Sequence, residues 1–141
     1  MKKILLLLVV ILFISCTREN ISTKIEKIIT QKDDLANIEN RKVTISKDDE
    51  IIEETIVSKD DRYIYVILKI KSGSKKKYLD IAKEKMDALS RGEWKFSFSE
   101  AVWFDVDDYI IRIYADDLSE IVKKLKKELG IEVNFVQKKS S

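Results

Sequence analysis

The chain has 141 residues, with 27 basic and 25 acidic side chains, one cysteine and no histidine. The lack of histidine excludes the commonest general base, the usual zinc ligand and any Ser-His or Cys-His nucleophile pair. One cysteine cannot form an internal disulfide. The near balance of charge gives no reason to expect nucleic acid as a partner.

The N-terminal segment is the most informative part of the sequence. Lys2 and Lys3 precede an uninterrupted apolar run from Ile4 to Ile14, and Ser15 and Cys16 follow it. The run is shorter than the roughly 20 residues of a transmembrane helix, and it is apolar on all sides, unlike a helix of a globular domain. This order predicts a secretory signal peptide over residues 1–15. Its removal leaves 27 − 2 = 25 basic residues against 25 acidic ones.

The residues Phe13-Ile14-Ser15-Cys16 resemble the lipobox of bacterial lipoproteins, in the relaxed form of spirochaetes. Cys16 and the small Ser15 fit the pattern, whereas Phe13 and Ile14 are bulkier than its usual residues. The resemblance covers residues 1–16 only. It implies that Cys16 is the first residue of the mature chain, with a diacylglycerol on its sulfur and an acyl group on its amine. Two or more acyl chains give stable membrane attachment. The alternative for Cys16 is a free, reactive thiol.

The position after the cysteine bears on localisation. Thr17 stands where an aspartate holds enteric lipoproteins at the inner membrane. The sequence therefore favours the outer membrane over the cytoplasmic membrane as the site of the anchor.

We expect residues 16–40 to form a lipidated tether and residues 41–141 a single folded domain. The tether is polar, yet four isoleucines within it recur at helical spacing, and Thr23 with Glu26 makes a capping-box pattern. These isoleucines are Ile21, Ile25, Ile28 and Ile29. Two interpretations stay open for this segment, a short amphipathic helix and a disordered spacer.

Alternation of apolar and polar residues from Lys42 onward predicts a β-rich domain. The predicted strands are 42–46, 51–57, 62–71, 93–99 with a continuation over 101–106, 109–115 and 131–136. Apolar stripes at helical spacing predict helices over 75–91 and 118–129, which Gly92 and Gly130 end. Both faces of the strand 62–71 are partly apolar, which is typical of a central strand.

The order of these elements from residue 62 resembles a ferredoxin-like βαββαβ unit, preceded by a β-hairpin. We therefore expect an α+β fold in which an antiparallel sheet carries both helices on one face. Fold alone does not define function.

The densest group of carboxylates is Asp105, Asp107, Asp108, Asp116 and Asp117. Two of them, Asp105 and Asp107, would lie on one side of a strand and could share a calcium ion. However, the glycine and glutamate of a calcium-binding loop are missing at the required spacing. Turn formation and helix initiation explain these aspartates better. We therefore expect no metal site, no cofactor and no enzymatic activity.

Two further features bear on surfaces. The lysines within 75–77 and 123–127 would form one basic face if the two helices are neighbours, and interspersed acids favour a solvated face over one that binds anionic headgroups. Tyr63, Tyr65 and Trp103 would form an exposed partner surface if the sheet face opposite the helices is open. The alternative is that the N-terminal helix covers that face.

Together, these features predict a membrane-anchored envelope lipoprotein that binds a protein or another envelope component. The alternative is a passive structural or assembly subunit of an envelope complex, without a discrete ligand. A contiguous aromatic patch would favour binding, and a charged sheet face would favour the passive subunit.

Overall fold

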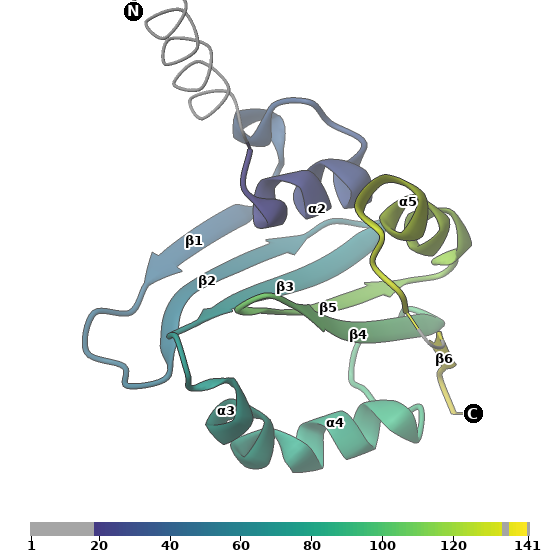
Figure 1. Ribbon diagram of the computed structural model, residues 1–141. Helices are drawn as coiled ribbons and strands as arrows, with labels where there is room; N and C mark the ends of the chain where they lie inside the picture. Colours follow the sequence, from purple (N-terminus) through teal and green to yellow (C-terminus); the bar gives the residue numbers. More distant parts are fainter. Residues whose placement is uncertain (1–18, 134–135, 141) are drawn as a thin grey trace, which may run out of the picture.

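The computed structural model describes residues 19–133 and 136–140, and it contains a six-stranded antiparallel sheet in the order β1-β2-β3-β5-β4-β6 (Figure 1). The predicted α+β class is confirmed. The strands are β1 (Arg41–Ile45), β2 (Ile52–Lys59), β3 (Tyr63–Ile70), β4 (Glu100–Val106), β5 (Tyr109–Ala115) and β6 (Gln137–Lys138).

Four α-helices and one 3₁₀ helix accompany the sheet in the described part of the chain. They are α2 (Ile21–Thr30), the 3₁₀ helix η1 (Leu35–Asn37), α3 (Lys75–Ile81), α4 (Lys83–Ser90) and α5 (Ser119–Leu129). The predicted helix over 75–91 is therefore two helices, because the backbone leaves helical geometry at Ala82.

The centre of the sheet is the antiparallel pair β3 and β5, as the two-sided apolar pattern of β3 predicted. Alternate residues of these strands point to opposite faces. Tyr65 and Ile67 belong to the core on one face, together with Ile111 of β5. Ile64 and Leu68 belong to the core on the other face.

The helices cover both faces of this sheet, so the prediction that they share one face is wrong. Figure 1 shows α2 and α5 above the sheet and α3 and α4 below it. The cores agree with this arrangement, because Ile25 and Leu125 pack with Tyr65, whereas Met86 and Leu89 pack with Ile64.

The position of the last strand explains this difference. In a ferredoxin-like sheet the last strand lies beside the first, here β3, but β2 already occupies that place and β6 pairs with β4 instead. The connections β3-to-β4 and β5-to-β6 then skip one strand in the same direction along the sheet. They begin on strands that run in opposite directions, so crossovers of the same hand must pass over opposite faces.

Two predicted strands are also wrong. Residues 93–99 form no strand, because Trp94 and Phe96 fold under the sheet instead, where both rings lie against Tyr114. Within the predicted strand 131–136, Ile131–Val133 are outside any strand, residues 134 and 135 are outside the described residues, and pairing with β4 begins only at Gln137.

The folded unit includes α2, so residues 21–30 are not part of a tether. Ile25 and Ile29 are buried in the same core as Tyr65 of β3, and α2 lies beside α5. Of the two interpretations left open for this segment, the amphipathic helix is the one that the structure contains. The signal segment 1–15, Cys16 and Thr17 lie outside the described residues.

Candidate functional site

The three aromatic residues predicted as a partner surface do not lie together. Tyr63 and Tyr65 are buried beneath α2, with 4% and 0% of their surface exposed. Trp103 is partly buried on the opposite face, against the core beneath α3 and α4. The open sheet face that these residues needed does not exist, because α2 covers it, as the alternative interpretation proposed.

A charged cluster is buried where the predicted patch was expected. Glu26 of α2 is fully buried, and its carboxylate accepts two hydrogen bonds from Arg41, Nε to Oε2 at 2.6 Å and Nη2 to Oε1 at 2.8 Å. The Tyr65 hydroxyl donates a third to Oε2 at 2.5 Å. The cluster therefore joins α2 to the first residue of β1 and to the central strand β3.

The pKa values of the cluster follow from burial and pairing. Burial raises the pKa of the Tyr65 hydroxyl well above its ordinary value, and its hydrogen bond to Glu26 raises it further. The hydrogen bonds to Glu26 raise the pKa of Arg41, although burial opposes this effect. Arg41 therefore stays protonated. Because both oxygens of Glu26 are engaged within the protein, the cluster leaves no carboxylate oxygen free for a ligand, and we assign it a structural role.

The cluster of Glu26, Arg41 and Tyr65 attaches the start of β1 to α2 and β3, at the edge of the sheet. β1 pairs with β2 along its whole length, from Arg41 opposite Ser58 to Ile45 opposite Glu54. Its other side has no strand partner within the described residues. An unpaired edge presents backbone N–H and C=O groups that can pair with another chain.

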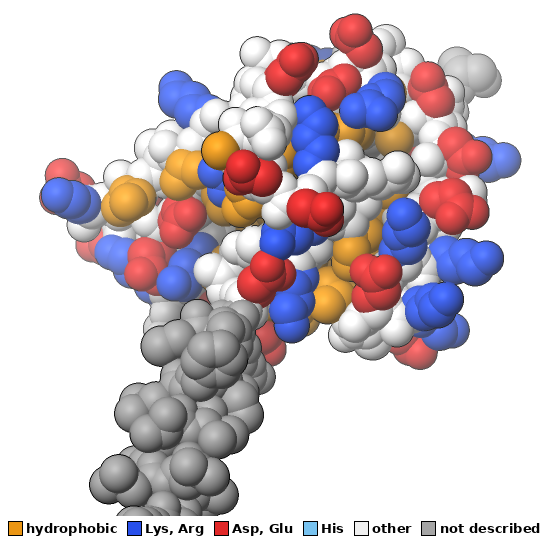
Figure 2. Space-filling view, turned by 90° about the horizontal axis from the view of Figure 1, so that it is seen from above, with side chains coloured by type: hydrophobic (Ala, Val, Ile, Leu, Met, Phe, Trp, Pro, Cys, Tyr) orange, Lys and Arg blue, Asp and Glu red, His pale blue; other side chains and the backbone are white. Residues whose placement is uncertain are grey.

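The side chains of β1 add an apolar surface to this edge. Val43 and Ile45 point to the same side as Arg41, and 42% and 66% of their surface is exposed. Among the large apolar residues of the described chain, only Ile81 is comparably exposed, at 67%. Figure 2 looks down on the α2 side, where acidic and basic side chains alternate and apolar groups appear toward the β1–β2 hairpin. We call Arg41–Ile45, with its unpaired backbone side, the β1 edge.

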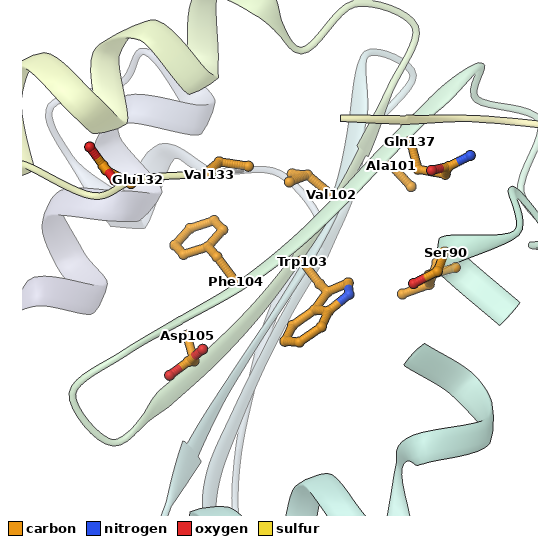
Figure 3. Close-up of a pocket in the computed structure, with 10 residues that line it drawn as sticks. Ser90, Ala101, Val102, Trp103, Phe104, Asp105, Glu132, Val133 and Gln137 are labelled. Atoms are coloured by element: carbon orange, nitrogen blue, oxygen red, sulfur yellow. The ribbon is translucent and has the colours of Figure 1, made fainter. Parts of the chain in front are cut away.

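A hollow lies toward the other end of the sheet, along β4. It measures about 160 Å³ and is lined by residues that include Ser90, Trp103, Asp105, Glu132 and Gln137. Figure 3 shows Phe104 and Trp103 pointing to opposite sides of β4, so the hollow lies along the strand edge rather than within a core. Small-molecule sites usually measure ~300–1,000 Å³. This hollow is therefore small for a substrate pocket.

The predicted carboxylates do not gather at one site, because their contacts are with separate neighbours. Asp105 pairs with Lys75, and Asp107 occupies the β4–β5 turn with φ at 51°. Asp116 accepts a hydrogen bond from the Ser99 backbone N–H at 3.1 Å. The Ser119 hydroxyl, 2.7 Å from Asp117 Oδ1, lowers the pKa of that carboxyl. In the described part of the chain, no cluster of acids, cysteine and histidine is arranged to hold a metal ion.

The lysine groups are also separated. Lys75–Lys77 belong to α3, and Lys123 to Lys127 belong to α5, which lies on the other face of the sheet. The two helices are not neighbours, so the prediction of a single basic face is wrong. Near α5, the wide hollow against α2 is lined mainly by charges of both signs, among them Lys24, Lys124 and Glu128.

Comparison with known proteins gave no match to a protein-family model, to a curated protein or to a solved structure. Within the described residues, no helix has the length and apolar character that crossing a bilayer requires.

Sequence reasoning missed Arg41 and gave Glu26 the wrong role. The predicted capping box of Thr23 and Glu26 is wrong, because Asn20 caps α2 and its Oδ1 accepts a hydrogen bond from the Thr23 backbone N–H at 2.9 Å. The only signal was that Glu26 flanks the apolar stripe of its helix, where a charged side chain needs a buried partner. No pattern connects it to Arg41, since the two are 15 positions apart and only the packing of α2 across the sheet brings them together.

Proposed function

We propose that this chain is a lipid-anchored protein of the bacterial envelope that binds a protein partner through the β1 edge. The observation behind this proposal is the combination of an unpaired strand edge with exposed Val43 and Ile45. Strand addition to such an edge is a common mode of protein recognition, in which the backbone supplies affinity and alternate side chains supply specificity.

The rigidity of the edge supports this role. Arg41 is held by two hydrogen bonds to Glu26, and Ser58 on the neighbouring strand donates a hydrogen bond to the Glu39 carbonyl at 3.2 Å. The edge is therefore already extended and ordered before a partner arrives. A preorganised surface loses less entropy on binding than a flexible one.

The lipid anchor is supported by the sequence of residues 1–16, and the start of α2 limits how far the domain could lie from that anchor. Four residues, Thr17 to Asn20, separate Cys16 from the start of α2 at Ile21. Even a fully extended link of this length spans less than about 20 Å at ~3.5 Å per residue. A lipid on Cys16 would hold the domain close to the bilayer and place the β1 edge near the membrane surface.

The anchor is tested by intact-mass spectrometry of the protein from its native host, wild type beside Cys16→Ala, with detergent-phase partitioning. We expect a wild-type chain that begins at Cys16 with added acyl mass and enters the detergent phase, and a Cys16→Ala chain that does neither. An unmodified wild-type chain in the aqueous phase would refute the anchor.

The β1 edge is tested by a photo-crosslinking amino acid placed at Val43 in living cells. Ile81 is the matched control, because it is an apolar side chain of similar exposure on α3, on the other side of the sheet. We expect a discrete adduct from position 43 and none from position 81. Equal labelling from both positions, or none from 43, would contradict the proposal and favour a passive envelope subunit.

A further inference from the structure

The backbone of β1 alternates between residues that bond to β2 and residues that face outward. The Ser46 N–H donates to the Glu53 carbonyl at 3.1 Å, in line with the register that places Thr44 opposite Thr55. In an antiparallel ladder, hydrogen-bonded and non-bonded pairs alternate. Lys42 and Thr44 therefore bond to β2. The N–H and C=O groups of Arg41, Val43 and Ile45 point away from the sheet, and none has a hydrogen-bond partner among the described residues.

We propose that the β1 edge pairs with the β1 edge of a second copy of this chain, antiparallel and centred on Val43. This inference rests on the proposed function, because it names the partner of that edge. In this register Val43 faces its own counterpart, and Arg41 faces Ile45 of the other copy. The Val43 pair and the two Arg41–Ile45 pairs all consist of outward-bonding residues, so each of them exchanges both N–H···O bonds.

The side chains of β1 are compatible with this self-pairing. Lys42 faces Thr44 of the second copy, so no like charges are directly opposite, an arrangement that would destabilise a sheet. The charge of Arg41 is already neutralised by Glu26. Val43 and Ile45 of both copies lie on one face of the joined sheet, where they cover one another's exposed surface.

The symmetry of the pair also agrees with a shared membrane. A twofold axis that joins two antiparallel edges stands perpendicular to the sheet, so it keeps α2 on the same side in both copies. Both anchors would then start from the same side of the joined sheet, since α2 is the first described element after Cys16 in the sequence. A short edge buries less than the ~1,600 Å² of a standard interface. Confinement to one membrane would raise the effective concentration of the two copies.

Cysteine trapping of the full-length chain in membranes of its native host tests this register. Lipidation consumes the Cys16 thiol, so an introduced cysteine is the only free one. Cα separations are about 5.5 Å for a bonded pair and about 4.5 Å for a non-bonded pair, and both allow a disulfide. We expect disulfide dimers from Val43→Cys alone, and from Lys42→Cys coexpressed with Thr44→Cys.

The matched control is Thr44→Cys alone. Thr44 is exposed and adjacent to Val43 but faces Lys42 of the other copy, so we expect this variant to stay monomeric. A second variant, Val43→Pro, removes an outward N–H without touching the β1–β2 ladder, a change that edge strands tolerate. Introduced into both coexpressed chains, it should abolish the Lys42→Cys to Thr44→Cys dimer.

The parent chain, which carries no introduced cysteine, distinguishes failure of the lipid anchor from failure of self-pairing. A disulfide dimer of the parent would show that Cys16 is free and that the anchor is wrong. A lipidated, monomeric parent with no dimer from Val43→Cys would overturn self-pairing and leave the anchor in place. An adduct of Val43→Cys with a different protein would also overturn self-pairing, while it would support recognition through the β1 edge.

Discussion

Replacement of Glu26 by glutamine should destabilise the domain, although it keeps the size of the side chain. Oε2 accepts hydrogen bonds from Arg41 Nε and the Tyr65 hydroxyl, and Oε1 accepts one from Arg41 Nη2. An amide has only one oxygen. In either orientation its NH₂ group faces an N–H of Arg41, so two donors oppose each other and the guanidinium loses its counter-charge.

The expected cost follows from burial. Removal of one partner from a buried ion pair costs ~3–5 kcal/mol. The Arg41 side chain keeps 21% of its surface exposed, so water partly solvates the orphaned charge, and we expect about 3 kcal/mol, the low end of this range. With a slope of about 1.5 kcal/mol per M of urea, the unfolding midpoint should fall by about 2 M.

Urea unfolding of the full-length chain in detergent, followed by far-UV circular dichroism, measures this effect. Glu19→Gln is the control, since Glu19 makes an exposed pair with Lys27, and exposed pairs contribute at most about 1 kcal/mol. A triple replacement of Glu26, Arg41 and Tyr65 by Leu, Met and Phe should recover most of the loss, because well-packed apolar residues often substitute for buried ion pairs. A decrease of less than about 1 kcal/mol in the free energy of unfolding for Glu26→Gln would refute the structural role of this cluster.

Three further predictions concern the core, the C-terminal segment and pH. Ile25→Ala should lower the free energy of unfolding, measured by urea titration, by about 2–5 kcal/mol. If residues 16–40 were a tether, this substitution would leave the free energy unchanged. The control Lys24→Ala should leave it unchanged in either case. Gly92→Ala should lower the thermal midpoint far more than Gly73→Ala: both have positive φ, but a Cβ at Gly92 would meet the Lys138 carbonyl and lie 2.8 Å from Ser140 N. The folded-state pKa of Tyr65 is raised, so its contribution is complete below the unfolded pKa of about 10 and is lost as pH rises above it. Urea midpoints at pH 8 and pH 11 should therefore differ less for Tyr65→Phe than for wild type, and equal differences would contradict the assigned pKa direction.

The sequence predicted those elements whose pattern is local. The strand 109–115 has the predicted bounds, because alternating apolar residues between two turns leave little choice of register. α5 begins within one residue of its predicted start and ends as predicted at Leu129, where Gly130 adopts the left-handed conformation of a C-cap.

The remaining errors arose where the outcome depends on distant parts of the chain. The apolar stripe of α5 shows that the helix must be buried, but not on which sheet face, and that choice depended on β2 occupying the place beside β3. The alternating Trp94, Phe96 and Phe98 match a strand pattern, yet the rings of Trp94 and Phe96 pack against Tyr114, and Phe98 is buried in the same core. For the β1 edge, Val43 and Ile45 are exposed because no strand among the described residues pairs with the outer side of β1, which no local pattern records.

The pairing of α2 with α5 also determines when the domain can become complete. The two helices lie near opposite ends of the chain and share one core layer. A chain delivered from its N-terminus, by a ribosome or through a translocation channel, exposes Ile25, Ile28 and Ile29 long before Leu125 emerges to cover that layer. Contacts of such long sequence separation slow folding. Folding of this domain should therefore be largely post-translational, because the core layer that contains α2 is incomplete until α5 has emerged.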